Sequence, residues 1–301
     1  MLCSKVTMCQ DGPVLSRVVA GMWRMAEWDM TASKRIHFIE QCIDLGVTTF
    51  DHADIYGSGE VESLFGEVIA QRPELKNKIE IVTKCGIVLP TTNDAATTSV
   101  KHYNMTPQHI VKSVDTSLGK LRIDKIDLLL LHRPSPLMDF YEIADTFYAL
   151  KASGKVLHFG VSNFTPNQLE ALNKLFPLTT NQIEFSPINL DPIDDGLFDI
   201  LQSYRISPMI WSALGGGRIM TEKSKNMLRV KEAFSAIGDL IGLSTEATIY
   251  SWISRLPCNP VILTGSQNIE LIKKAVIGSH LKMDFIHWFE LLQEIRGYEV
   301  A

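Results

Sequence analysis

The sequence predicts an α/β fold, a (β/α)8 barrel of the TIM type, and three observations support this prediction. Short β-rich runs recur along the chain, and each is followed by a polar loop and then by a segment with helical spacing of apolar residues. Eight such units can be read, mostly spaced by about 25–30 residues, and eight is the number that closes a barrel. Near-continuous apolar strands such as DLLLL indicate a parallel sheet that is buried on both faces.

The predicted strands and helices follow one another in a regular order. The strands are expected at 17–22, 47–50, 79–84, 126–132, 156–162, 180–185, 207–212 and 260–265. Two helices have well-marked starts: Thr31 is a plausible N-cap for the helix over 31–46, and Thr106 with Pro107 begins the helix over 106–121.

Several segments depart from this repeat. Short N-terminal strands are expected to cap the barrel, and a polar, Thr- and Asn-rich loop at 86–105 follows the third strand. The run GGGRIM (215–220) and two helical segments separate the last two strands, and an amphipathic stretch at 283–295 should form a helix on the outside of the barrel. Because no linker or low-complexity tract is visible, residues 1–301 are predicted to form a single domain.

A doubly wound sheet is the competing architecture. It normally carries the pattern GxGxxG after the first strand, and the residues at 20–25, AGMWRM, do not match it. The GSG at 57–59 lacks the third glycine, so the barrel is favoured.

Composition and charge narrow the class of protein. The 301 residues are 46% hydrophobic and 21% charged, with a net charge of −5, so the chain has no basic footprint for nucleic acid or for an anionic membrane. We expect a cytoplasmic protein, because the N-terminus lacks an apolar signal region and no long uncharged apolar run is present. Its five cysteines are scattered and odd in number, which argues against a disulfide framework or a zinc site. The sequence is compatible with a monomer and does not specify the oligomeric state.

Polar side chains gather where the predicted strands end. In a barrel of this type the carboxyl ends of the strands form the active-site face. The side chains found there are Trp23, Asp51, Tyr56, Lys84, His132, Ser162, Asn163, Gln182, Glu184, Trp211, Ser212, Gly265 and Ser266.

Four of these side chains suggest proton-transfer chemistry. Lys84 closes an apolar strand, which is costly unless the ammonium is paired, and Asp51 is the obvious partner on the neighbouring strand. A buried cation beside a phenol favours the phenolate, so Lys84 is expected to lower the pKa of Tyr56. The imidazole of His132 could orient a carbonyl oxygen toward the Tyr56 hydroxyl.

Other roles for the same residues were weighed. Asp51 and Asp54 could be turn formers, and for Asp54 this is the preferred interpretation. No metal site is expected, because the adjacent Asp51 and His52 point to opposite sides of a strand. Lys84 could act as the nucleophile of a Schiff-base aldolase, which remains the enzymatic alternative.

Five segments, FDHADIYG, IVTKCG, LLLLHRPSP, GVSNF and NQIEFSP, resemble in order and spacing the signature segments of the aldo-keto reductase family. The resemblance covers nearly the whole chain. The phrases DLGVTTFDHADIYG, HFGVSNFTP and WSALGGGR look especially like its bacterial YdhF-type branch.

The resemblance implies a role for each matching residue. Asp51, Tyr56, Lys84 and His132 match the family's catalytic tetrad, with Tyr56 as the proton donor. The residues that match the cofactor site are Ser162, Asn163 and Gln182 at the nicotinamide carboxamide, Trp211 on the nicotinamide ring, Ser212, Leu214, Gly216 and Arg218 at the pyrophosphate, and Gly265, Ser266, Gln267 and Lys273 around the adenosine 2′-phosphate. An aldolase would not explain the carboxamide-binding residues.

Two departures from the family pattern concern the cofactor. The phosphate-binding segment often carries Arg or Lys where this chain has Gln267, and Asn where it has Ala275. Lys273, Lys274 and Arg218 could supply the charge instead. NADP(H) is therefore the expected cofactor, NAD(H) is the alternative, and no metal is required.

A third departure concerns the substrate side. His52 stands where the family usually has Thr or Ser, and we expect it, with Trp23 and Trp28, to line the substrate pocket. The short C-terminal tail suggests an open pocket and broad substrate use.

The function implied by the resemblance is the NADP(H)-dependent reduction of aldehydes or ketones to alcohols. The alternative from another class is a cofactor-binding regulatory or redox-sensing subunit with slow turnover, similar to the potassium-channel β-subunits that share this fold.

Overall fold

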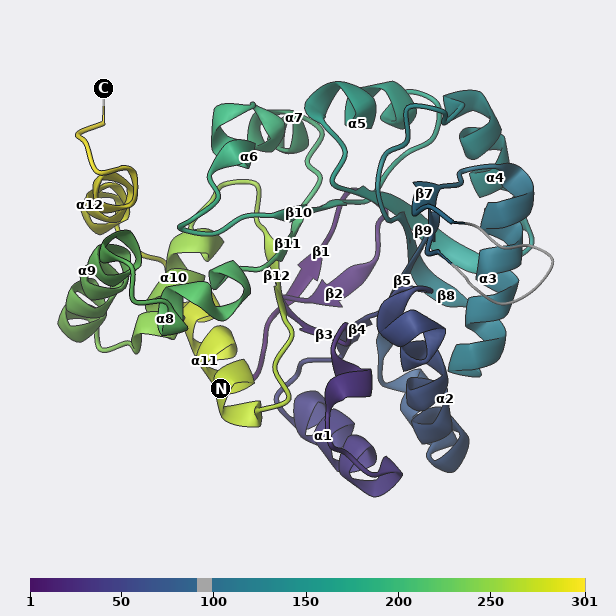
Figure 1. The fold of residues 1–301 in the computed structure, drawn as a ribbon, viewed down its shortest axis with the longest axis horizontal. Coiled ribbons are helices and arrows are strands. Elements are labelled where there is room, and N and C mark those ends of the chain that lie inside the picture. Colours follow the sequence, from purple (N-terminus) through teal and green to yellow (C-terminus); the bar gives the residue numbers. More distant parts are fainter. Residues whose placement is uncertain (91–98, 301) are drawn as a thin grey trace.

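A computed structural model describes residues 1–90 and 99–300 of the chain. Within these residues, eight parallel strands close into a barrel in the order β10-β11-β12-β3-β4-β5-β8-β9 (Figure 1). The strands are β3 (Val18–Gly21), β4 (Thr49–Asp51), β5 (Glu80–Cys85), β8 (Ile126–Leu131), β9 (Val156–Ser162), β10 (Asn181–Glu184), β11 (Met209–Trp211) and β12 (Val261–Thr264). Each lies within or overlaps one of the predicted runs, so the barrel prediction is confirmed.

Helices surround the barrel. They are α1 (Ala32–Asp44), α2 (Val61–Gln71), α3 (Pro107–Leu121), α4 (Phe140–Ala152), α5 (Pro166–Asn173), α6 (Asp191–Asp194), α7 (Leu197–Ser203), α8 (Arg218–Thr221), α9 (Lys225–Ile241), α10 (Thr245–Ser254), α11 (Ile269–His280) and α12 (Phe285–Arg296). The two predicted caps are present: the hydroxyl of Thr31 accepts from the backbone N–H of Lys34, and that of Thr106 accepts from the backbone N–H of His109. None of the described helices is long and apolar enough to cross a membrane.

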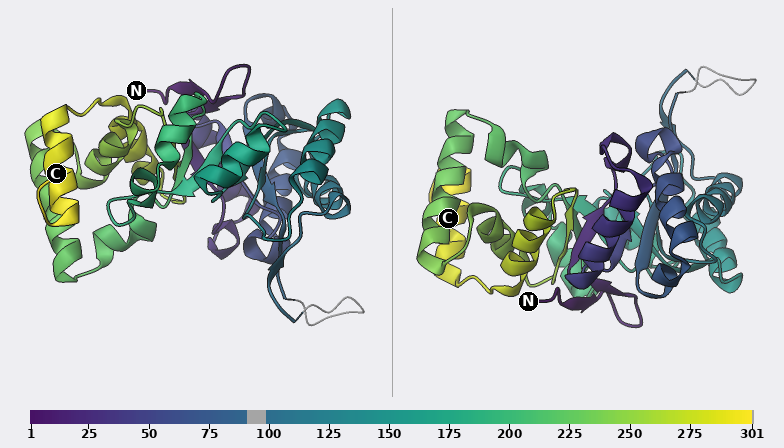
Figure 2. Two further views of the ribbon diagram at one scale, coloured as in Figure 1. Left: turned by 90° about the horizontal axis from the view of Figure 1, so that it is seen from above. Right: turned by 90° about the horizontal axis from the view of Figure 1, so that it is seen from below.

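An N-terminal hairpin closes one end of the barrel. It consists of β1 (Lys5–Thr7) and β2 (Val14–Ser16), and it contributes Val6, Met8 and Leu15 to an inner apolar cluster with strand residues such as Leu128. Figure 2 shows this hairpin at one end of the molecule and the segment around the grey trace projecting from the other. The predicted N-terminal cap strands are therefore confirmed, and the opposite end of the barrel carries the candidate site.

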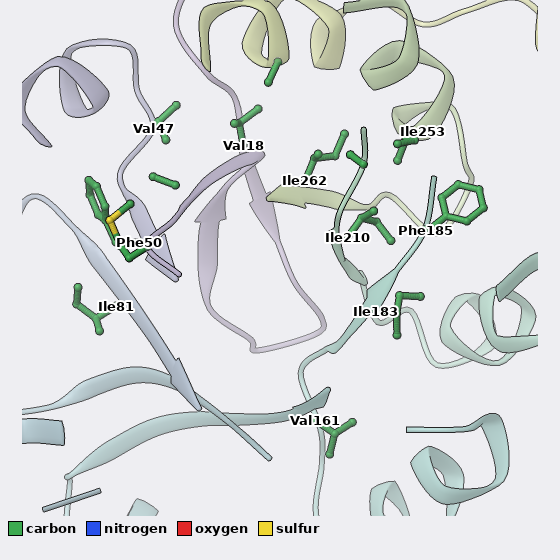
Figure 3. Packing of buried hydrophobic residues seen from close by; sticks show 14 of the residues in the cluster. Val18, Val47, Phe50, Ile81, Val161, Ile183, Phe185, Ile210, Ile253 and Ile262 are labelled. Atoms are coloured by element: carbon green, nitrogen blue, oxygen red, sulfur yellow. The ribbon is translucent and has the colours of Figure 1, made fainter. Parts of the chain in front are cut away.

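The outer apolar layer lies between the barrel and its helices. Phe50, Ile81, Val161 and Ile262 are completely or almost completely buried and point outward from four different strands (Figure 3). Because each outward residue alternates with an inward one, this layer fixes which side chains face the barrel interior.

The C-terminal helix α12 packs on the outside of the barrel, as predicted. It lies beside α9 in both views of Figure 2, and its Trp288 stacks on Trp252 of α10 at 5.3 Å between ring centroids. The predicted polar loop at 86–105 contains the strand pair β6 (Ile87–Val88) and β7 (His102–Tyr103), while its residues 91–98 lie outside the described residues.

Candidate active site

Alternation along the strands brings the candidate side chains into one place. In β8, Leu128 and Leu130 belong to the inner cluster, so the next residue of the same parity, His132, also faces inward. The same reasoning applies to Lys84, which follows the inward Val82 of β5. The register pairs Val82 with Asp51 of β4, and the acidic side chain therefore reaches the lysine across one strand gap.

Lys84 is at the centre of the arrangement. Its Nζ donates to Asp51 Oδ2 at 2.6 Å, to the backbone oxygen of His52 at 2.8 Å and to the Tyr56 hydroxyl at 2.9 Å. The Lys84 side chain is 0% exposed and that of Asp51 is 3% exposed. Burial alone would lower the pKa of Lys84, but the Asp51 carboxylate and the Tyr56 oxygen raise it overall, so the ammonium stays charged. The predicted pairing of Lys84 with Asp51 is confirmed.

The predicted pKa shift of Tyr56 is wrong in its net direction. Lys84 lowers the pKa of Tyr56 through its charge and its hydrogen bond, as expected, but burial of the phenol is the larger effect and raises it. The phenol is therefore more firmly protonated in the folded protein than in water. Sequence reasoning weighed the neighbouring cation and left out the cost of burying a phenolate.

His132 lies edge-on to Tyr56, with 5.7 Å between the ring centroids. Burial, and then the charges of Lys84, Arg133 and Lys101, lower the pKa of His132 to about 2, so the imidazole is neutral. Its Nδ1 is buried and has no hydrogen-bond partner among the described residues. A neutral imidazole beside the phenol can orient a carbonyl oxygen without a charge of its own.

The carboxamide-binding candidates form a hydrogen-bonded chain next to these residues. Trp211 Nε1 donates to Asn163 Oδ1 at 3.2 Å, and Asn163 Nδ2 donates to Ser162 Oγ at 2.7 Å. Ser162 Oγ in turn donates to the backbone oxygen of Gln182 at 2.9 Å. Gln182 Nε2 then donates to Asp51 Oδ1 at 2.7 Å, which joins this chain to the buried ion pair. The structure thus brings together both groups of predicted residues.

The loop after β11 has the backbone shape that phosphate binding requires. Gly215, Gly216 and Gly217 all have positive φ, at 60°, 67° and 93°, and an added Cβ would meet nothing within 4 Å at the last two. The preceding Ser212 also has a positive φ of 55°. A backbone without side chains on its open face can lie close to a phosphate group, so this loop fits the pyrophosphate of a dinucleotide.

The cations expected near a 2′-phosphate already have carboxylate partners. Lys273 pairs with Glu270 at 2.6 Å, Lys274 with Glu246 at 2.8 Å and Arg218 with Glu222 at 2.9 Å between the charged atoms. In the other part of this predicted segment, Gly265 and Gln267 are exposed and Ser266 is half-buried.

Arg24 is a cation that sequence reasoning missed. Its Nη2 lies 3.7 Å from the point where a Cβ on Gly265 would stand, and it comes from the loop after β3. The signal was present in AGMWRM, where a basic residue follows the end of the first barrel strand.

One of the three predicted pocket residues points away from the barrel interior. His52 is 0% exposed and packs edge-on against Phe65 of α2 at 4.5 Å between centroids, because it points away from the barrel interior. Burial lowers the pKa of His52 to about 3. Trp28 is also buried, with Phe38 of α1 at 5.3 Å. The prediction that His52 lines the substrate pocket is wrong. Trp28, which is 9% exposed, and Trp23, which is 63% exposed, remain predicted pocket residues.

Asp51 and His52 do point to opposite sides of β4, as the strand geometry predicted. Within the described residues, no group of three or more His, Cys, Asp or Glu side chains is placed to hold a metal ion.

The chain is similar in sequence and in fold to known proteins. The model of the Aldo/keto reductase family matches residues 17–284. Oxidoreductase YdhF of Escherichia coli is 44% identical over 298 residues, which are 98% of this chain and 99% of the relative. A 6-dehydroglucose reductase of Agrobacterium fabrum is 41% identical and covers 95% of this chain and 96% of its own. A glycerol dehydrogenase of Gluconobacter oxydans shares the fold, with a TM-score of 0.86 at 20% identity over 100% of this chain and 98% of that one.

Proposed function

The chain belongs to the aldo/keto reductase family of oxidoreductases, and on that premise we propose that it reduces the carbonyl group of a small aldehyde or ketone with NADPH. The observation that carries the proposal is the buried chain from Tyr56 through Lys84 to Asp51, with contacts of 2.9 Å and 2.6 Å. A phenol whose proton is held in place beside a charged ammonium is suited to donating that proton and then to existing briefly as a phenolate.

Each residue has a defined task in this proposal. Ser162, Asn163 and Gln182 would hold the carboxamide, Trp211 would support the nicotinamide ring, and the open backbone of Gly216 and Gly217 would bind the pyrophosphate. NADPH, when bound, supplies a hydride to the carbonyl carbon.

The proton comes from the protein. The Tyr56 O–H bond breaks, its proton goes to the carbonyl oxygen, and the alcohol forms. The phenolate that remains is stabilised by Lys84, whose own charge is balanced by Asp51. His132, neutral and next to the phenol, orients the carbonyl oxygen before transfer.

The cofactor preference rests on the available cations. Lys273, Lys274 and Arg218 can each bind a 2′-phosphate only by leaving or sharing a carboxylate partner. Arg24, beside Gly265, forms no ion pair within the described part of the chain and is a further candidate for this role. The name of the Agrobacterium relative, a 6-dehydroglucose reductase, supports carbonyl reduction as the direction of the reaction.

The proposal predicts that Tyr56→Phe retains NADPH binding and loses reductase activity by about 10²- to 10⁴-fold, the usual contribution of a general acid. NADPH absorbance would be followed with a panel of aldehydes, and NADPH binding by fluorescence. Tyr141→Phe is the matched control, because Tyr141 is 71% exposed on α4 and makes no side-chain hydrogen bond within the described residues.

Three results would contradict the proposal. Unchanged turnover in Tyr56→Phe would remove Tyr56 from the acid role. NADPH binding without turnover of any carbonyl would favour a cofactor-binding regulatory subunit. A covalent adduct on Lys84 after borohydride treatment with substrate would favour Schiff-base chemistry.

A further inference from the structure

We propose that the carbonyl substrate carries an anionic group, which Arg133 and Lys101 recognise at the mouth of the barrel. The inference rests on the proposed function and specifies the substrate class of the same site. Arg133 follows His132 directly after β8, and Lys101 stands directly before β7, which pairs with β6 beyond the end of β5. Neither residue was singled out by the sequence motifs.

Arg133 lies over the mouth. It follows His132 directly after β8, and its guanidinium carbon is 5.7 Å from the ring centroid of Trp211 on β11. In the barrel, β9 and β10 separate β8 from β11. A contact between Arg133 and Trp211 therefore requires the arginine side chain to reach across the open end, above the inward-facing residues. The residue is half-buried there.

Neither cation is neutralised by a described residue. Among the described residues, no acceptor is within hydrogen-bond or ion-pair distance of the Arg133 guanidinium or the Lys101 ammonium. Three of the cations assigned to the cofactor segments differ in this respect, since Arg218, Lys273 and Lys274 each have a carboxylate partner, whereas Arg24 has none among the described residues. A guanidinium presents five N–H donors in a planar fork that matches a carboxylate or a phosphate.

The charges that act on His132 include three positive ones. The pKa of His132 is lowered first by burial and then by Lys84, Arg133 and Lys101, and Arg133 also acts to lower the pKa of Tyr56. Among these positive charges, Asp51 neutralises only that of Lys84. The charges of Arg133 and Lys101 therefore remain as a net positive field beside the carbonyl position, in a chain whose overall charge is −5.

The acidic side chains at this end do not remove that field. Both oxygens of Asp51 are already engaged, one by Lys84 and the other by Gln182. Glu184 of β10 pairs in register with Trp211, and within the described residues it forms no ion pair with Arg133 or Lys101. An anion on the substrate, a few bonds from its carbonyl carbon, would supply the missing counter-charge to Arg133.

The test compares anionic aldehydes with their neutral esters. The first pair of probes is 4-carboxybenzaldehyde and methyl 4-formylbenzoate, and the second is succinic semialdehyde and its methyl ester. The two pairs differ in the distance between the aldehyde and the carboxylate. We expect wild-type protein to have a higher kcat/KM for the anion in at least one pair. In Arg133→Gln the ratio of kcat/KM between anion and ester should fall by about 10- to 100-fold, the effect of losing one hydrogen bond to a charged group.

Two further variants sharpen the comparison. Lys101→Gln should reduce the same ratio by only about two- to fivefold, because Lys101 is exposed. Lys125→Gln removes the same charge at the opposite end of the barrel, just before β8, and should leave the ratio unchanged. High salt should weaken the preference for the anion in the wild type.

Three outcomes would overturn the inference. The first is equal or better use of the ester in both pairs by the wild type. The second is a loss in Arg133→Gln that is the same for both members of a pair and appears as a raised KM for NADPH, which would assign Arg133 to the cofactor.

The third outcome comes from a binding experiment that does not depend on the proposed reductase activity. If no aldehyde is reduced, quenching of tryptophan fluorescence by 4-(hydroxymethyl)benzoate and by its methyl ester, with NADP⁺ present, still measures the preference for an anion. Tighter binding of the carboxylate that is lost in Arg133→Gln would support the inference without turnover, and equal binding of the two compounds would overturn it.

Discussion

The substitution Asp51→Asn removes the negative charge of the ion pair and keeps the size of the side chain. Asparagine has the size of aspartate and can still accept the hydrogen bond from Gln182, but it offers no negative charge to Lys84. Because the Lys84 side chain is 0% exposed, its ammonium would then be a buried charge without a counter-ion. Breaking one partner of a buried pair typically costs about 3–5 kcal/mol, so the free energy of unfolding should fall by that amount near neutral pH.

The loss should depend on pH with a defined sign. In the wild type the folded-state pKa of Lys84 lies above its usual 10.5, so the contribution of the pair is fully present below about pH 10.5 and is lost above it. In Asp51→Asn, burial is no longer opposed by the carboxylate and the pKa falls below that value. The unfolded chain then binds a proton that the folded chain does not, and stability rises with pH by up to about 1.4 kcal/mol per unit.

Urea unfolding, followed by tryptophan fluorescence from about pH 6 to about pH 9, measures both effects. The matched control is Asp115→Asn, which breaks the ion pair of Asp115 with Lys155, whose side chains are 50% and 40% exposed. This control should lose no more than about 1 kcal/mol and should show no such slope. A loss in Asp51→Asn as small as in the control, with no dependence on pH, would refute the assignment of Lys84 as a buried, charged group.

Three further predictions concern other parts of the molecule. Gln182→Met should lower the free energy of unfolding in urea by about 1–3 kcal/mol and should lower kcat/KM, because one oxygen of Asp51 loses its hydrogen-bond donor. Unaltered stability and kinetics would show that this hydrogen bond is dispensable. Burial and Glu62 raise the pKa of Asp54 to about 7, so the free energy of unfolding of the wild type should fall as pH rises from about 4 to about 7. Asp54→Asn should lose this part of the pH dependence, and parallel plots of unfolding free energy against pH for the two proteins would contradict the assignment. Gly66→Ala should destabilise the protein by about 1–3 kcal/mol in thermal unfolding, since the added Cβ would overlap the carbonyl oxygen of Lys120 where α2 meets α3. A Tm equal to that of the wild type would mean that α2 and α3 move apart without loss of stability.

Periodicity was sufficient to predict the fold. The alternation of apolar segments found every barrel strand, and the caps at Thr31 and Thr106 located two helix starts to within a residue. These features are local, because a strand that is buried on both faces and a helix that begins at a threonine each carry their signal in a few adjacent residues.

The candidate site was predictable only as far as strand ends could place it. Asp51 and Lys84 could be paired in advance, since alternation and neighbouring strands determine their meeting. The contact of Arg133 with Trp211 could not, because it joins strands that are not neighbours and depends on how a long side chain leans across the mouth. His52 was misplaced although alternation already put it on the opposite side of the strand from Asp51, because its position in the motif was weighed above the direction of its side chain.

The raised pKa of Tyr56 and the proton-donor role are compatible. A donor must hold its proton at the pH of the reaction, and burial secures this by penalising the phenolate. The same burial would make transfer unfavourable if the phenolate had no partner, and here Lys84 lies 2.9 Å from the hydroxyl with its charge fixed by Asp51. In the proposed reaction, burial therefore keeps the proton on Tyr56 before transfer, and the ion pair stabilises the anion that transfer leaves. The two opposing influences on one pKa would act at different stages of that reaction.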